Sequence, residues 1–557
     1  MRPGRVERTG KEPFSPSLLS KAGCLRTPLT LLATALLLAA CSKVGGSGWG
    51  TAHELRIGLV NDPPSLNPLF EYVERQIDLT QLYCETLVGL DAHNRLVPLL
   101  ATQVPSAANG GISRDGRTIV YHLRHDARFA DGVPLTSKDV AFTYRAILDP
   151  RNPVVDADPY RIIAGLDTPD KYTVRIRLRH PWAAAVGELF APSDFAFGIL
   201  PAHAFASTDI AHAAWNSRPF GSGPFRVERW ARGDEIDLVP NPYAWRKPHL
   251  HRLIFKIVAD NEAMFDAFRA HDLDVDNLTI LQVPQARALG DVTLLPVARN
   301  GFDYLSFQTA KAPTNDVRVR RAIVQAIDRA DLLRQTYVGL RPIADTEIPN
   351  VLWAHDPAIR PPRYDPVAAG RALDAAGWRL SGTRRMRNGV PLTIELVSDP
   401  RDYNRRIDSI VQRDLSLVGI DVTIRTFTNP LMYAPAAAGG IQYGGRFNLF
   451  ADNLYGGTDP EESEQWTCVR RAPNGPNMAR FCDAAYDAAY ANQQLTLDRA
   501  ARGRFFGIMQ QRIAAQAVLL PLVNDVEYVA INPALRDFRP NMLYDYGDGD
   551  RWDVVRP

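Results

Sequence analysis

Cysteine is scarce in this chain: five cysteines occur among 557 residues. An excess of charge of one sign is also missing, because 64 lysines and arginines nearly balance 62 aspartates and glutamates and leave a net charge of +2. The basic residues are dispersed, so the sequence gives no reason to expect a nucleic-acid partner. Hydrophobic residues make up 46% and charged residues 23% of the chain, which is typical of a globular protein.

The short motifs of common enzyme classes are absent as well. The chain has no Gly-x-Ser-x-Gly elbow, no His-Glu-x-x-His zinc pair and no Gly-x-x-x-x-Gly-Lys-Ser/Thr phosphate loop. His249 and His251 stand two residues apart without acids or cysteines nearby, so strand or loop histidines are a better interpretation than a metal site. These absences favour a binding protein without catalytic residues, metal or cofactor over a membrane-anchored hydrolase.

The chain has one long apolar run, near its N-terminus. Residues 29–40 are uncharged, follow several basic residues and lead directly into Cys41. Because a membrane-spanning helix needs about 20 apolar residues, this run is interpreted as the core of a signal peptide. Small residues directly before Cys41 resemble the bacterial lipobox, whose cysteine is lipidated and becomes the first mature residue. The alternatives are an ordinary signal peptide and a buried N-terminal helix.

We therefore expect residues 1–40 to be a lipoprotein signal peptide and residues 41–50 a flexible tether rich in glycine and serine. The mature chain would be lipid-anchored on the periplasmic or cell-surface side of a bacterial membrane. In that oxidising compartment Cys468 and Cys482 could close a loop, a disulfide worth about 3 kcal/mol by chain entropy. The alternative is that Cys468 and Cys482 are two unpaired buried thiols. Cys84 lies in an apolar helical pattern and is interpreted as a core residue.

The length exceeds the size at which a single core stops growing, so two or more lobes are expected. Strands and helices interleave along the chain, which predicts an α/β protein with antiparallel additions. Alternating apolar residues predict strands at 54–60, 118–123, 172–178, 253–258, 392–397 and 421–425, and a hairpin at 225–239. Helical spacing or a helix-start pattern predicts helices near 77–87, from 136, and at 261–270, 317–337, 366–376 and 403–418.

Several stretches together resemble the dipeptide- and oligopeptide-type solute-binding proteins, family 5, that feed bacterial ABC importers. The strongest is the strand, turn and helix signature at 121–140, with Gly132 and Pro134 in its turn. Others follow in the family's order at 221–225, 241–245, 316–329, 364–378 and 418–422. The similarity covers nearly the whole mature chain.

The resemblance implies a two-lobed periplasmic-binding-protein clamp of type II, cluster C, with an extra subdomain inserted in the first lobe. Lobe one would comprise residues 51–95, 200–300 and 520–557, the insert residues 96–199, and lobe two residues 301–519. The lobes would close around a small peptide by hinge motion and deliver it to a membrane permease, with the binding protein itself a monomer. A binder of another solute, such as a metal chelate, an opine-like conjugate or a sugar, or a sensor-linked receptor, is the alternative.

The resemblance also implies ligand-binding residues. In the family, a carboxylate shortly before an Asp-Pro or Glu-Pro step holds the peptide's ammonium group, which makes Asp452 the first candidate and Asp459 the reserve. Arg446 would lie near the ligand's carboxylate end. Glu71, Tyr72 and Val73 would pair with an extended peptide as an added strand. The alternatives are a loop-capping aspartate, a solvated arginine and a plain loop, respectively.

Overall fold

The computed structural model describes residues 49–70, 74–193, 197–205 and 209–555. Cys41, the predicted signal peptide and most of the tether lie outside these residues, as do Glu71, Tyr72 and Val73. Within the described ranges, no helix combines the length and the apolar character that crossing a membrane requires.

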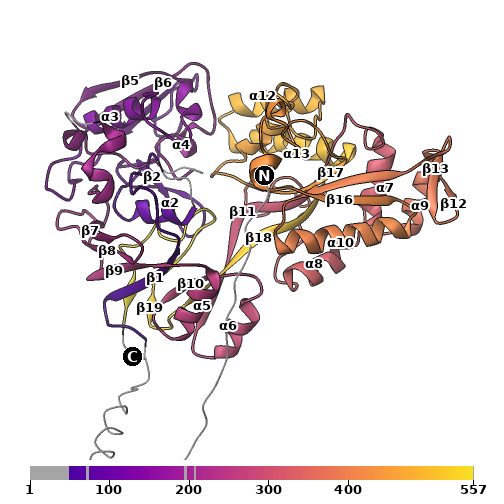
Figure 1. Ribbon diagram of the computed structural model, residues 1–557. Helices are drawn as coiled ribbons and strands as arrows, with labels where there is room; N and C mark the ends of the chain where they lie inside the picture. Colours follow the sequence, from indigo (N-terminus) through magenta and orange to yellow (C-terminus); the bar gives the residue numbers. More distant parts are fainter. Residues whose placement is uncertain (1–48, 71–73, 194–196, 206–208, 556–557) are drawn as a thin grey trace, which may run out of the picture. The chain divides into compact units, whose positions relative to one another are not determined.

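One mixed sheet of ten strands runs through the described part of the chain (Figure 1). In spatial order its strands are β16 (Asp421–Thr426), β15 (Thr393–Ser398), β17 (Leu449–Tyr455), β11 (Thr293–Phe307), β18 (Leu519–Ile531), β10 (Val275–Leu278), β1 (Glu54–Val60), β9 (Arg252–Val258), β8 (Glu235–Pro240) and β7 (Phe225–Ala231). β1 pairs in parallel with β10 and β9, and β15 pairs in parallel with β16 and β17. β7, β8 and β9 form an antiparallel meander, so the predicted α/β class with antiparallel additions is confirmed.

β11 and β18 are the longest strands and join the two ends of this sheet. They pair antiparallel with each other, while β11 also pairs with β17 and β18 with β10. Their register shifts between Ala298 and Phe302, close to the middle of β11, and again between Asp303 and Tyr304. The pair therefore forms a continuous connection with two irregular points close together, and Figure 1 shows it between the β1 and β17 regions.

Smaller sheets and the helices surround these strands. The three-stranded sheets are β4 (Thr118–His122), β6 (Thr173–Leu178) and β5 (Ile163–Asp170), and β12 (Arg379–Ser381), β13 (Arg384–Arg387) and β14 (Val390–Pro391). The two-stranded sheets are β2 (Val88–Leu90) with β3 (Leu96–Pro98), and β19 (Leu535–Arg536) with β20 (Asp553–Val554). The helices are α2 (Glu74–Gln81), α3 (Ser137–Leu148), α4 (Ala185–Glu188), α5 (Asn261–Arg269), α6 (Val283–Leu289), α7 (Val317–Ala326), α8 (Arg329–Tyr337), α9 (Pro366–Ala375), α10 (Asp402–Leu417), α11 (Asn429–Met432), α12 (Ala484–Leu495) and α13 (Arg499–Gln516).

Local signals explain where several of these elements begin. The predicted helix start at Thr136 is the N-cap of α3, where Asp139 accepts a hydrogen bond from the Thr136 backbone N–H at 2.8 Å. The single helix predicted at 317–337 is wrong, because the segment forms α7 and α8 with a break between them. The Asp328 side chain accepts from Asp331 N–H and starts a new helix there.

The apolar cores follow the sheet. The largest cluster contains Leu55 and Ile57 of β1 and extends into the β4 and β6 sheet through Ile119 and Val174. Two further clusters lie around β15 with α10, and around α12 with α13. The core is thus continuous from the predicted lobe one into the predicted insert, and the two further clusters also include residues of the predicted lobe one, such as Leu522 and Met542. The domain boundaries themselves stay a prediction.

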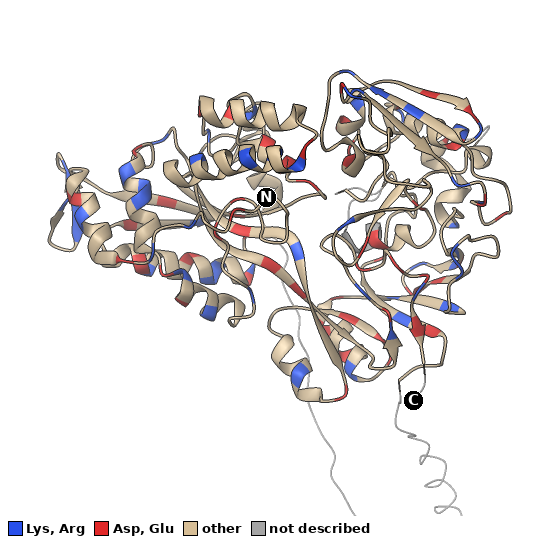
Figure 2. Cartoon of the chain, turned by 180° about the vertical axis from the view of Figure 1, so that it is seen from behind, with Lys and Arg blue, Asp and Glu red and all other residues tan. Residues whose placement is uncertain are grey.

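Charge is distributed over the whole described part of the chain. Figure 2 shows Lys and Arg interspersed with Asp and Glu on helices and strands alike. This agrees with the near balance of basic and acidic residues in the sequence.

Candidate functional site

Asp452 lies on β17 directly opposite Tyr304 on β11. The half-buried carboxylate accepts a hydrogen bond from the Tyr433 hydroxyl at 2.8 Å and a long one from the Tyr304 hydroxyl at 3.5 Å. Burial raises the pKa of Asp452 to about 7, while the Tyr433 hydrogen bond and the charge of Arg401 act in the opposite direction. The group can thus ionise near neutral pH when a cation arrives.

Aromatic rings pack against Tyr304, the residue that pairs with Asp452. The Phe302 and Tyr304 rings stack with centroids 5.0 Å apart, and the Trp466 ring meets Tyr304 edge-on at 6.0 Å. Phe450, two residues before Asp452, adds a further edge-on contact with Tyr304 at 6.3 Å. These rings limit the access of water, which explains why burial dominates the shift in the pKa of Asp452.

Arg401, whose charge acts on Asp452, is already engaged with other groups. Its Nε donates to Asp399 at 2.7 Å, and its guanidinium lies over the Tyr403 ring at 4.8 Å. Asp399 is buried, and the paired arginine holds the pKa of this carboxyl below its usual value against the effect of burial. Asp452 therefore feels a nearby positive charge without forming an ion pair of its own with Arg401.

Asp303, the neighbour of Tyr304, joins a second polar group. It accepts a hydrogen bond from the Tyr337 hydroxyl at 2.5 Å and from Arg341 at 3.3 Å, and Arg341 also pairs with Asp525 at 2.5 Å. Burial raises the pKa of Asp303, and Arg341 partly counters this effect. Asp303 pairs with Asn453, the neighbour of Asp452, and its charge helps to raise the pKa of Asp452.

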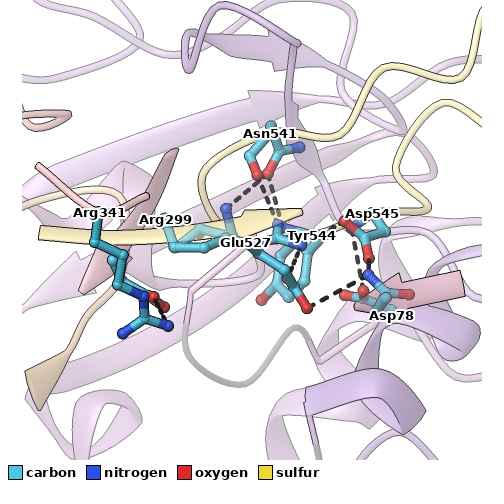
Figure 3. Close-up of polar contacts among 10 residues, drawn as sticks. Asp78, Arg299, Arg341, Glu527, Asn541, Tyr544 and Asp545 are labelled. Carbon is cyan, nitrogen blue, oxygen red and sulfur yellow. Dashed lines mark hydrogen bonds and ion pairs between the residues drawn. The ribbon is translucent and has the colours of Figure 1, made fainter. Parts of the chain in front are cut away.

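A buried network at Arg299 ties β11 to β18 and to the C-terminal segment near the first register shift (Figure 3). The Arg299 guanidinium pairs with Glu527 and Asp545 at 2.5 Å each and donates to the Asn541 carbonyl at 2.8 Å. Asp545 also accepts from Asn277 at 2.8 Å, and its backbone N–H donates to Asp78 of α2 at 3.1 Å. The network thus joins five parts of the chain, namely α2, β10, β11, β18 and the C-terminal segment, and Arg299 itself contacts the last two.

The other predicted ligand residues have different surroundings. Asp459 is buried and accepts hydrogen bonds from Arg502 Nη1 and Nη2 at 2.7 and 2.6 Å, so its carboxylate is occupied by an internal partner. Arg446 is exposed beside a glycine-rich turn, with its guanidinium near Gly439. Cys468 and Cys482 are joined by a disulfide bond, while Cys84 is a free, buried thiol.

Sequence reasoning missed the partners of Asp452. Tyr304 and Tyr433 reach it from 148 and 19 residues away along the chain, and neither carries a motif. Glu347, a buried acid, carries no motif either. Within the described residues, no group of three or more His, Cys, Asp or Glu is arranged to hold a metal ion.

Comparison with known protein families gives a match over most of the chain. The model of the bacterial extracellular solute-binding proteins, family 5, middle part, matches residues 95–475. This range contains the 121–140 signature, Asp452 and the Cys468 side of the disulfide.

Curated relatives of this chain bind different solutes. Di/tripeptide-binding protein 2 of Pseudomonas aeruginosa is 25% identical over 471 residues, which cover 79% of this chain and 85% of that protein. The nickel-binding periplasmic protein of Escherichia coli is 26% identical over 474 residues, which cover 82% of this chain and 86% of that protein. The relatives are solute-binding proteins rather than enzymes, and their names point to more than one class of ligand.

Solved structures share the fold. NikA from Brucella suis in complex with Fe(III)-EDTA has a TM-score of 0.78 at 23% identity, over 90% of this chain and 100% of that one. The oligopeptide-binding protein AppA from Bacillus subtilis, in complex with a nonapeptide, has a TM-score of 0.71 at 19% identity, over 90% of this chain and 99% of that one. The predicted two-lobed clamp of the type II periplasmic binding proteins is confirmed.

Proposed function

This chain belongs to the bacterial extracellular solute-binding proteins of family 5, the binding components of ABC importers, and on this basis we propose that its ligand is a small peptide. The protein would capture the peptide outside the cytoplasmic membrane and present it to the permease. Cys41 would carry the lipid anchor, and the residues after it would form the tether.

The observation that carries the proposal is the environment of Asp452. A peptide ammonium that leaves water needs a carboxylate partner, because an unpaired buried charge is costly. Asp452 offers a half-buried carboxylate that accepts from two tyrosine hydroxyls, and no arginine or lysine in the described part of the chain forms an ion pair with it. Asp459 remains the reserve, but its bidentate pair with Arg502 favours Asp452 as the amine partner.

The remaining contacts follow from the family's mode of binding. Residues 71–73 would pair with the peptide backbone as an added strand, and Arg446 would lie near the peptide's carboxylate. Water-mediated contacts would accommodate the side chains, so one protein could accept several peptides. Closure of the two lobes about β11 and β18 would then enclose the ligand.

The first experiment identifies the natural ligand. The mature domain, purified without refolding, is denatured, and the released small molecules are analysed by mass spectrometry. We expect peptides. A metal chelate, an opine-like conjugate or a sugar as the dominant molecule would contradict the proposal and select the corresponding alternative.

The second experiment tests Asp452 directly by calorimetric titration with an unmodified tripeptide such as Ala-Ala-Ala. Asp452→Asn keeps the side chain's shape but removes its charge, so we expect affinity to fall by about tenfold or more. Asp402→Asn, which changes an exposed acid on α10, is the matched control and should bind like the wild type. Equal affinity of the Asp452→Asn variant and the wild type would remove this residue from the site.

A further inference from the structure

Glu347 is a buried acid that the proposed amine site does not use. Its exposed fraction is 5%, and neither of its carboxylate oxygens has a hydrogen-bond partner among the described residues. Burial raises the pKa of this carboxyl to about 8. An acid in such surroundings is stabilised most by a group that brings a positive charge together with hydrogen-bond donors.

Glu347 lies in the wall between two cavities. The outer cavity has a volume of about 90 Å³, and Arg321 and Arg360 border it. Both arginines are exposed, and Arg360 lies 4.0 Å from Asp345. Asp345 also lines this cavity, so its two arginines and two acids balance in formal charge and the outer cavity does not favour a cation.

The second cavity, which we call the inner slot, is bordered by Glu347, Phe302, Leu454 and Trp466. Of the described residues that line it, none is a lysine, arginine or histidine, and Glu462 adds a second acid. The inner slot therefore favours a cation, in contrast to the outer cavity.

The inner slot lies on the same face of the sheet as Asp452. In the ladder of β11 and β17, Phe302 pairs with Leu454, and Tyr304, two residues further along β11, pairs with Asp452. Residues two apart in a strand face the same way, so Leu454 and Asp452 share a face. The Trp466 ring, which borders the slot, also contacts Tyr304 beside Asp452. A ligand held at Asp452 thus lies next to the slot.

The size of the inner slot limits which cation fits. Its volume of about 10 Å³ is close to that needed for one water molecule. An ammonium group is similarly compact, whereas a planar guanidinium needs more room. The volume takes the ammonium group alone, so the alkyl chain that carries it would lie outside the slot, against the apolar surfaces of residues that border it, such as Phe302 and Leu454.

We propose that Glu347 and the inner slot form a specificity subsite for a second ammonium group of the ligand, such as a lysyl or ornithyl side chain of a peptide whose terminal amine lies at Asp452. The inference rests on the proposed peptide function. It assigns to Glu347 a preference among peptides, whereas Asp452 serves every peptide with a free amine.

The test compares peptides that differ only in the charged group. Lys-Ala-Ala and Ala-Lys-Ala are titrated against their norleucine counterparts, which keep the alkyl chain and lack the ammonium. For the wild type we expect at least one lysyl peptide to bind about tenfold tighter than its counterpart. In Glu347→Gln this advantage disappears, while the affinity for the norleucyl peptides is unchanged.

A control variant separates the two cavities. Asp345→Asn changes an acid that borders only the outer cavity, so it should keep the lysyl advantage. If the slot holds only a water that joins Trp466 Nε1 to Glu347, lysyl and norleucyl peptides bind the wild type alike, and the proposal is overturned. An advantage that survives in Glu347→Gln overturns it as well.

Failure of the peptide function gives a different result. If no peptide binds, 1,5-diaminopentane is used as the probe, because it has two ammonium groups and an alkyl chain without a peptide bond. A rise in the melting temperature of the wild type that is lost in Glu347→Gln would keep the subsite while rejecting the peptide function. No rise in the wild type, or an equal rise in both proteins, would reject the subsite too.

Discussion

At the scale of single residues, the surroundings of Asp452 favour its neutral acid in the empty protein and its ionised carboxylate when an ammonium group is bound. Its pKa in the folded chain is about 7, well above the ordinary value near 4 for an aspartate in an unfolded chain. Above pH 7 the folded protein must therefore keep an ionised carboxylate in surroundings that favour the neutral acid. This cost to stability decreases as the pH falls from about 7 and is gone only below about pH 4, where the unfolded chain is protonated too. A bound ammonium reverses the preference, because it stabilises the ionised form.

This reversal predicts the pH dependence of peptide affinity. Below about pH 7 the empty site is protonated and must lose its proton to pair with the ammonium, so affinity should fall by up to about tenfold per pH unit between 7 and 5. The hydroxyls of Tyr304 and Tyr433 and the charge of Arg401 also influence Asp452, but the pKa of each of these three groups is raised above an ordinary value of 10 or more, so they stay protonated in this range. Asp303 acts on Asp452 as well, and burial raises the pKa of its carboxyl.

Calorimetric titrations of a peptide without ionisable side chains, at pH values from 5 to 8, provide the measurement. The Asp452→Asn variant should show a weak and nearly constant affinity over the same range. A wild-type affinity that stays constant from pH 8 to 5 would show that the ammonium is held elsewhere.

At the scale of elements, the Asp459–Arg502 pair connects the loop after β17 to α13. Arg502 also donates to Gln493 Oε1 of α12 at 2.7 Å, and Glu461 lies 3.5 Å from its guanidinium. Burial, and then the charge of Asp459, raise the pKa of Glu461 to about 7, so this arginine balances more than one acid. The guanidinium of Arg502 thus holds the loop after β17, α12 and α13 together.

Arg502→Met should therefore lower the free energy of unfolding by about 3–5 kcal/mol, because it leaves Asp459 buried without its partner. Urea denaturation provides the measurement, and the double variant with Asp459→Asn should recover part of the loss. The single variant Asp459→Asn should leave peptide affinity close to that of the wild type. A loss of affinity equal to that of Asp452→Asn would instead make Asp459 the amine partner.

At the scale of the whole molecule, β11 and β18 are the long connection between the two ends of the main sheet. Their first register shift lies beside Arg299, whose ion pairs join β11, β18 and the C-terminal segment. An irregular ladder bends more easily than a regular one, so this point is suited to act as a hinge. The buried ion pairs would keep the strands together while they bend.

Small-angle X-ray scattering tests the closure. The radius of gyration of the mature domain should decrease when a binding peptide is added at saturating concentration. The Asp452→Asn variant, at a peptide concentration too low for it to bind, should keep the larger value. An unchanged radius in the wild type, with binding verified by calorimetry, would show that capture needs no closure.

Much of the fold could be predicted from local patterns. β1 lies at the predicted residues 54–60, because its alternation is regular and turn residues end it. β11 was missed because residues 299–307 are buried without alternation and because Pro296 and Gly301 interrupt the strand pattern. The division between α7 and α8 depends on a cap at Asp328 that helical spacing alone does not reveal.

The amino-acid sequence by itself determined the class of protein, through family motifs spread along the chain, and it singled out Asp452 as a candidate. Only the tertiary structure decided which groups surround that carboxylate, that Arg502 already occupies Asp459, and that Glu347 borders a slot on the Asp452 face. The physical reason is that motifs and periodicity record local backbone preferences, whereas burial, pKa and charge pairing depend on residues that meet only after the sheet has formed.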